Sequence, residues 1–301
     1  MHFCRFDLIN ASLNDESMPL EKNISIVCNN LAGGGRAVAL GKRIGVELQN
    51  RNINHSLYIE DWPEDFNRFT DVWVVGGDGT LNYFINKYPG IRLPLVIFNG
   101  GTGNDVHWLL YKNKNFEEQL QIALTATPRP VDGGRCNEKY FLNGVGIGFE
   151  GAVAKTLTGK KKTRKGKAAF MGTILQKVFF YSSKKYKTIS DEYTAEGQQL
   201  LISVMNGHRA GGGFHIAPSS AIDDGLLDVI MVDKLHPFLR LRWLPVIEKG
   251  KHLGLPFIKF FRTKKLVIIS EQPMDTHLDG EYYSAKRVAI EILPSKYLFR
   301  Y

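Results

Sequence analysis

Two glycine-rich segments place carboxylates where a phosphate group could be held. Gly76-Gly-Asp-Gly-Thr80 follows one apolar run of the sequence, and Gly100-Gly-Thr-Gly-Asn-Asp105 follows the next. Glycines let backbone amides surround a phosphate, while Asp78 and Asp105 can face Mg²⁺ or a hydroxyl group. A simple turn would need one glycine rather than three around one aspartate. The two segments therefore predict a phosphate-binding site with carboxylates beside it.

Three further segments carry similar residues but also have plainer interpretations. Residues 29–37 are rich in asparagine and glycine and resemble a phosphate loop, without the Lys-Ser/Thr ending of a Walker A motif. A tight turn after a strand is the alternative there. Asp132 precedes a Gly-Gly pair near the middle of the chain. Asp279 and Glu281 flank Gly280, where a hairpin turn of the Asp-Gly type is the alternative.

Apolar patterning predicts the elements that would position these segments. A short apolar strand ends in each of the three N-terminal glycine segments, which indicates an open α/β layer with mostly parallel strands. The predicted strands cover 24–28, 56–59, 71–75 and 93–98, and the predicted helices cover 36–49 and 81–87. Ligands bind at the carboxyl ends of such strands, so the three glycine segments are expected to meet there.

The pattern changes after Asp132. Predicted strands at 140–149, 200–206, 227–232 and 265–270 follow without regular intervening helices, which indicates an antiparallel second domain. Four parts of the chain are expected. They are a polar N-terminal extension at 1–22, an α/β nucleotide-binding domain at 23–132, a β-rich domain at 133–290 and a segment at 291–301 that returns to the first domain.

The positive charge of the chain is concentrated in one run. The formal net charge is +9, and Lys160–Lys167 contributes six positive charges within eight residues. A solvated loop is the usual interpretation of such a run. The apolar helical face that follows, from Phe170 to Val178, makes peripheral contact with an anionic membrane surface the alternative. No nucleic-acid partner is expected, because no motif of that kind accompanies the charge.

The remaining composition points to a cytoplasmic protein, at most peripheral to a membrane. The longest apolar stretch, at 168–181, is shorter than the roughly 20 residues that a membrane-spanning helix needs. Residues 1–19 lack a signal-peptide pattern. The three cysteines show no metal-binding spacing, and so sparse a count fits a reducing compartment.

The combination of motifs resembles the diacylglycerol kinase catalytic-domain family. That family also includes sphingosine and ceramide kinases and is distantly related to NAD kinases. The resemblance lies in Gly76–Thr80 with Asn82, in Gly101–Asp105 and in Asp279-Gly-Glu281, in that order. It extends through 143–149, 211–213 and 218–228, from Ile24 to about Leu293. The chain departs from the family pattern at Asn30, Gly103 and Glu150, and the threonine that often contacts nucleotide is not placed near 56–61.

The resemblance implies an ATP- and Mg²⁺-dependent lipid kinase with an α/β domain and a β-sandwich domain. Glu281 would accept a proton, with Asp78, Asp105 and Asp132 as further catalytic carboxylates. An accessory Mg²⁺ site would use the Asp224 carboxylate and the carbonyls of Ala221 and Leu226. The residues implied in ATP binding are Asn29, Gly33, Gly34, Gly35, Gly76, Gly77, Asp78, Gly79, Thr80, Leu81, Asn82, Thr102 and Asn104.

The acceptor and the assembly stay open at this stage. Diacylglycerol or a related lipid is the expected substrate, and a sphingoid base or NAD is the alternative acceptor. A nucleotide-binding regulator with the same fold and no turnover is the alternative from another class. The intact carboxylates favour the enzyme. A homodimer is compatible with the sequence.

Overall fold

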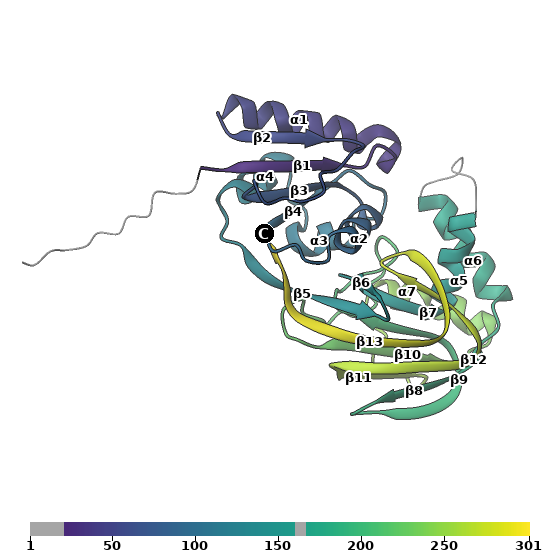
Figure 1. Cartoon of the computed structure of the whole chain (residues 1–301). Helices are drawn as coiled ribbons and strands as arrows, with labels where there is room; N and C mark the ends of the chain where they lie inside the picture. The colour runs from purple at the N-terminus through teal and green to yellow at the C-terminus, as the bar shows by residue number, and fades with distance from the viewer. Residues whose placement is uncertain (1–20, 160–166) are drawn as a thin grey trace, which may run out of the picture.

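The computed structural model describes residues 21–159 and 167–301 (Figure 1). The extension predicted at 1–22 and the basic run at 160–167 therefore lie almost wholly outside the described residues. The rest forms an α/β domain and a strand-rich domain, joined by the long strand β13 (Glu281–Phe299).

The first domain is an open parallel sheet covered by helices. Its strands lie in the order β4-β3-β1-β2, and every strand pair in this part is parallel. All six residues of β3 are buried, as expected for a central parallel strand with helices on both faces. The elements are β1 (Asn23–Cys28), α1 (Arg36–Asn50), β2 (Asn54–Tyr58), β3 (Asp71–Gly76), α2 (Asp78–Lys87), β4 (Leu95–Asn99), α3 (Asp105–Tyr111) and α4 (Phe116–Thr125).

The second domain is built from antiparallel strands around a separate apolar core. Strand β12 pairs with β13, and its two halves pair with β8 and β7 on either side of a bulge. The elements are β5 (Arg129–Cys136), β6 (Lys139–Phe141), β7 (Gly144–Gly148), β8 (Lys184–Ser190), β9 (Thr194–Met205), β10 (Leu227–Asp233), β11 (Ile258–Thr263) and β12 (Lys265–Leu278). The expected α/β and β-rich fold is confirmed.

The expectation that regular helices are missing from the second half is wrong. Helices α5 (Phe149–Gly159), α6 (Lys167–Phe180) and α7 (Pro237–Glu248) lie between its strands. Helix α5 begins directly after β7, where Gly148 has a left-handed φ of 84°, so the predicted strand at 140–149 ends one residue early. Buried residues of α6 such as Ile174 and Val178 pack with strand β10 in a third apolar cluster.

The last residues of the chain lie on the first domain. Phe299 at the end of β13 is a parallel partner of Leu95 in β4. The next residue, Arg300, forms an ion pair with Asp71, which is fully buried at the start of β3. Arg300 also donates a hydrogen bond to the carbonyl of Ala126 at 2.6 Å. The C-terminus therefore ties the strand-rich domain to the parallel sheet.

Loss of this buried ion pair should destabilise the protein. Arg300→Ala leaves the Asp71 carboxylate buried without its cation, so the free energy of unfolding should fall by about 3 kcal/mol. Lys185→Ala removes an exposed ion pair with Glu196 and should lower the free energy of unfolding far less. Urea unfolding of both variants measures the difference, and equal losses would contradict a tying role for Arg300.

Candidate active site

The glycine segments Gly76–Thr80 and Gly100–Asp105 lie against each other at the carboxyl ends of β3 and β4. The Gly100 amide donates to the Gly76 carbonyl at 2.9 Å, and the Asp78 amide donates to the Gly103 carbonyl at 3.1 Å. A Cβ atom on Gly77 would stand 2.7 Å from the Gly103 carbonyl oxygen. Glycine is required here because the two backbones approach so closely.

The N-terminal glycine segment, at residues 29–37, lies in the same cluster. Gly33, Gly34 and Gly35 all have left-handed φ angles and form a short 3₁₀ turn before α1. A Cβ atom on Gly33 would stand 2.2 Å from the Gly100 carbonyl oxygen. The Asn29 side-chain amide donates to the Thr80 hydroxyl at 3.1 Å. The structure thus brings the three predicted segments together.

Arg36 links these loops and was not predicted from the sequence. Its guanidinium donates to the Gly33 carbonyl at 3.1 Å and to the Gly101 carbonyl at 2.9 Å. The available signal was its position as the first charged residue after the glycine run. Arg36 thus connects the loop at residues 29–37 to the loop at residues 100–105, and its positive charge lies beside the cluster.

Asp78 points to the start of α3. Its two carboxylate oxygens accept the backbone N–H groups of Asp105 at 2.9 Å and Val106 at 3.1 Å. Burial raises the pKa of Asp78 to about 7, the nearby Asp105 carboxylate adds to this rise, and the two backbone hydrogen bonds oppose it. Asp78 therefore holds the second and third loops together through the free amides of a helix N-terminus.

Asp105 connects the first domain to the second. Its carboxylate accepts the Gly212 backbone N–H at 2.8 Å and lies 3.5 Å from the Arg209 guanidinium. Burial raises the pKa of Asp105, against the effect of Gly212 and Arg209. A pocket of about 440 Å³ opens here and is lined by Thr102, Asn104, Asp105, Trp108, Lys112 and Arg209, among others.

Asp279 makes a further connection between the domains. Its carboxylate accepts the backbone N–H groups of Leu142, Asn143 and Gly144 at 2.8–2.9 Å. It also accepts the Asn82 side-chain amide of α2 at 3.1 Å. Burial raises the pKa of Asp279, and these four hydrogen bonds act against that rise. The Asp-Gly turn between β12 and β13 exists, but its aspartate also fixes the turn to α2.

Glu281 follows this turn and lies over the start of α2. A Cβ atom on Gly79 would stand 2.8 Å from the Glu281 Oε1 atom, so the carboxylate faces the second glycine loop. Glu281 is exposed, unlike Asp105, Asp132 and Asp279. Its carboxylate has no hydrogen-bond or ion-pair partner within residues 21–159 and 167–301. Among the predicted catalytic carboxylates, it is the one free to take a proton from a ligand.

His277 and Glu150 stabilise the turn at residues 279–281. The Gly280 amide donates to His277 Nδ1 at 3.2 Å, and His277 Nε2 lies 3.5 Å from Glu150. Ser203 donates to the other oxygen of Glu150 at 2.8 Å. The departure from the family pattern at Glu150 thus has a structural use, because this side chain reaches the histidine beside the turn.

Asp132 contacts residues 221–226, called here the accessory loop, and within the described residues it makes no hydrogen bond to the glycine loops. Its carboxylate accepts the backbone N–H groups of Gly225 and Ser295, both at 2.7 Å. Asp224 accepts the Leu226 backbone N–H at 3.0 Å and lies 3.7 Å from Arg262. No cluster of three or more metal-ligating side chains occurs in the described part of the chain. One carboxylate with backbone carbonyls is still a donor set of the hard oxygen type that suits Mg²⁺.

A second pocket of about 470 Å³ lies beside the first glycine segment. It opens at the carboxyl ends of β1 and β2 and is lined by Cys28, Asn29, Asn30, Ile59, Glu60, Trp62, Tyr83 and Lys87. The rings of Trp62 and Tyr83 meet edge to face at 5.5 Å. The sequence did not indicate this aromatic wall. Its signal was limited to isolated aromatic residues that lie far apart along the chain.

Comparison with known proteins agrees with the motifs. The family model for the diacylglycerol kinase catalytic domain matches residues 23–136, and that for the YegS C-terminal NAD kinase beta sandwich-like domain matches residues 143–298. The chain therefore belongs to the lipid kinase family that combines these two domains, which confirms the expected resemblance.

Individual relatives are distant but cover most of the chain. A "probable lipid kinase YegS-like" protein of Shewanella frigidimarina is 28% identical over 76% of this chain and 75% of its own. Diacylglycerol kinase of Bacillus subtilis is 26% identical over 71% of this chain and 72% of its own. The crystal structure of a diacylglycerol kinase from Bacillus anthracis shares the fold. Its TM-score is 0.69 at 22% identity, covering 93% of this chain and 97% of that one.

No helix in the described part of the chain is long and apolar enough to cross a membrane.

The raised pKa of Asp78 predicts a pH dependence of stability. An unfolded aspartate has a pKa of about 3.9, so between about pH 4 and pH 7 the folded protein keeps a proton that the unfolded chain has lost. Stability should therefore decrease as pH rises through this range. Asp78→Asn cannot titrate, so its free energy of unfolding should decrease less than that of the wild type between about pH 5 and pH 7.5.

Urea unfolding at both pH values measures this difference. Asp191→Asn, at an exposed position, serves as the control and should follow the wild type. Parallel pH profiles for the wild type and Asp78→Asn would show that Asp78 has an ordinary pKa in the fold.

Proposed function

We propose that this protein is an ATP- and Mg²⁺-dependent lipid kinase that phosphorylates a hydroxyl group of diacylglycerol or a related lipid. The observation that carries the proposal is the free Glu281 carboxylate, held over Gly79 at the start of α2. A general base must reach the proton that it removes. At this position a hydroxyl group could lie between the glutamate and a phosphate on the glycine loops.

The glycine loops and the start of α2 would bind the phosphates of ATP. The N-terminus of a helix carries free N–H groups and partial positive charge, both of which favour phosphate. Gly34 and Gly35 have open space where a Cβ atom would stand, which leaves the first loop accessible to a ligand. The pocket beside Asn29, with its Trp62 and Tyr83 rings, would take the nucleoside.

Phosphoryl transfer needs positioning and charge stabilisation more than covalent chemistry by the protein. Glu281 would accept the proton of the lipid hydroxyl group while the oxygen of that hydroxyl group forms a bond to the γ-phosphorus. The bond from that phosphorus to the β,γ-bridging oxygen breaks, and ADP leaves. Asp78 and Asp105 would hold the loops in place, because their oxygens are engaged by backbone N–H groups.

Asp224, with the carbonyls of Ala221 and Leu226, would hold an accessory Mg²⁺ ion. Bound Mg²⁺ would offset the charge of the Asp224 carboxylate and hold this loop in one conformation. Asp132 would connect this loop to the first domain, because its carboxylate accepts the amides of Gly225 in the loop and of Ser295 in β13. The end of β13 pairs with β4 of the first domain.

The acceptor is inferred from relatives and from one segment of this chain. Relatives are named lipid kinases and diacylglycerol kinase. Pro218–Asp228, which contains the accessory loop, resembles the lipid branch rather than the NAD kinases. The direct test incubates the protein with labelled ATP and a panel of diacylglycerol, ceramide, sphingosine and NAD, with and without Mg²⁺. Label on diacylglycerol supports the proposal; label on NAD alone, or on none of the panel, contradicts it.

Glu281→Gln should separate proton transfer from nucleotide binding. The amide keeps the shape of the side chain and cannot accept the proton, so kcat should fall by about 100-fold or more. ATP affinity should change little, because the backbone loops hold the phosphates. Steady-state kinetics and nucleotide titration measure the two effects. Glu138→Gln, at an exposed turn, is the matched control, and an unchanged kcat for Glu281→Gln would exclude it as the base.

The basic run Lys160–Lys167 is proposed to contact an anionic membrane surface. Residues 160–166 of this run lie outside the described residues, and its six positive charges within eight residues carry the proposal. A homodimer is also compatible with the sequence.

A further inference from the structure

Helices α6 and α7 expose apolar side chains that the fold does not use. Of the ten large hydrophobic side chains that are exposed in the described part of the chain, six lie on these two helices. Phe180 is 81% exposed and Phe238 is 69% exposed. The six, called here the α6–α7 patch, are Leu175, Phe179, Phe180, Phe238, Leu239 and Leu241.

The opposite faces of both helices already have partners. Ile174 and Val178 of α6 are buried in the third apolar cluster, and Leu244 and Ile247 of α7 pack against it. A helix that is apolar on all sides normally has all sides covered. The patch is therefore an additional apolar surface, and exposed surfaces of this kind mark interaction sites. Figure 1 shows α6 at the periphery of the molecule, beyond α5.

The two halves of the patch are held in a fixed arrangement. The rings of Phe179 and Phe238 meet edge to face at 6.2 Å. Beneath them the buried Arg240 of α7 donates to the carbonyls of Val178 and Tyr181 at 3.0 and 2.7 Å. These bonds connect the C-terminus of α6 to the N-terminus of α7, so the patch is preformed.

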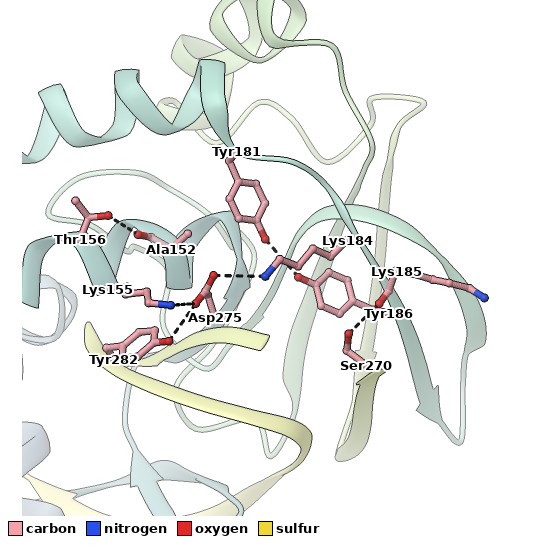
Figure 2. Close-up of polar contacts among 10 residues, drawn as sticks. All are labelled: Ala152, Lys155, Thr156, Tyr181, Lys184, Lys185, Tyr186, Ser270, Asp275 and Tyr282. Carbon is pink, nitrogen blue, oxygen red and sulfur yellow. Dashed lines mark hydrogen bonds and ion pairs between the residues drawn. The ribbon is translucent and has the colours of Figure 1, made fainter. Parts of the chain in front are cut away.

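A hydrogen-bonded network anchors the segment that follows α6. Figure 2 shows Asp275 of β12 with Lys155, Lys184 and Tyr282 around its carboxylate. Nearby, the hydroxyl groups of Tyr181 and Tyr186 lie 3.4 Å apart. The single negative charge of Asp275 is shared by Lys155 and Lys184 and offsets only part of their charge. Cations without an ion-pair partner among the described residues lie on or beside α6 and α7.

The sequence around the patch is strongly basic. Residues 151–190 contain eleven lysines and arginines and no acidic residue, although the whole chain has a net charge of only +9. Five cations on or beside the two helices have no ion-pair partner among the described residues. They are Lys177, Lys234, Arg242, Lys249 and Lys251.

We propose that the α6–α7 patch inserts into the surface of an anionic lipid bilayer. Exposed phenylalanine and leucine side chains on helices that also carry unpaired cations suit such a surface, where apolar burial and attraction to anionic lipid add together. A second copy of this chain fits less well, because a two-fold contact would bring the same cations together. The inference rests on the proposed function, since a bilayer would supply the lipid acceptor.

The test is sedimentation of the full-length protein with vesicles. Phosphatidylcholine vesicles with and without phosphatidylglycerol are compared at low and high salt. Phe180→Ser/Phe238→Ser should weaken binding to the anionic vesicles about tenfold or more, because two apolar anchors are lost. Val46→Ser, at a position on α1 that is 55% exposed, is the matched control and should bind like the wild type.

A second variant tests the charge independently of the apolar residues. Lys249→Glu/Lys251→Glu should also weaken binding to anionic vesicles, and added salt should weaken binding of the wild type. Equal binding of the Phe180→Ser/Phe238→Ser variant and the wild type would overturn the proposal. So would a change from dimer to monomer in that variant without loss of vesicle binding, which would assign the patch to a contact between copies.

Kinase activity on a short-chain, water-soluble diacylglycerol separates this inference from the proposed function. The patch variants should keep that activity, because the patch lies outside the glycine loops and Glu281. Vesicle binding without any turnover would contradict the proposed function alone. Turnover by the wild type, together with unaltered vesicle binding by the Phe180→Ser/Phe238→Ser variant, would contradict the inference alone.

Discussion

The arrangement of the candidate site depends on one buried carboxylate, that of Asp279. It accepts three consecutive backbone N–H groups, from Leu142 to Gly144, and the amide of Asn82. These bonds compensate for burying a charge, which would otherwise be costly. Since Asn82 belongs to α2 and Asp279 to the β12–β13 turn, the same bonds hold Glu281 over Gly79. The proposed base, Glu281, is thus positioned by a neighbour whose carboxylate accepts four hydrogen bonds.

The other predicted carboxylates follow the same principle. Asp78 joins two glycine loops, Asp105 joins the first domain to the loop at Gly212, and Asp132 joins the accessory loop to β13. Each accepts hydrogen bonds from backbone N–H groups that would otherwise lack partners. Hydrogen-bonded acidic side chains thus hold the loops of this site in place, and the Glu281 carboxylate is left without such a partner among the described residues.

Sequence reasoning found the loops because their signal is local. Gly76–Thr80 and Gly100–Asp105 each follow an apolar strand, and adjacent parallel strands bring such loops together. The partners of Asp279 could not be found in this way, because they lie between 135 and 197 positions away. The same limit applies to Arg36, whose bond to Gly101 spans 65 positions. Of the helices in the second half, α6 had a signal in the apolar helical face at 170–178, whereas α5 and α7 were missed because apolar strands dominated the pattern around them.

The central claim is that Asp279 positions Glu281, and Asp279→Asn tests it most directly. Asparagine tolerates the left-handed φ of 48° at this position, so the change removes charge with little backbone strain. Hydrogen exchange at the amides of Leu142, Asn143 and Gly144 should become about tenfold faster or more. In the same variant kcat should fall, while the affinity for ATP stays unchanged. Unchanged exchange and unchanged kcat would contradict the account.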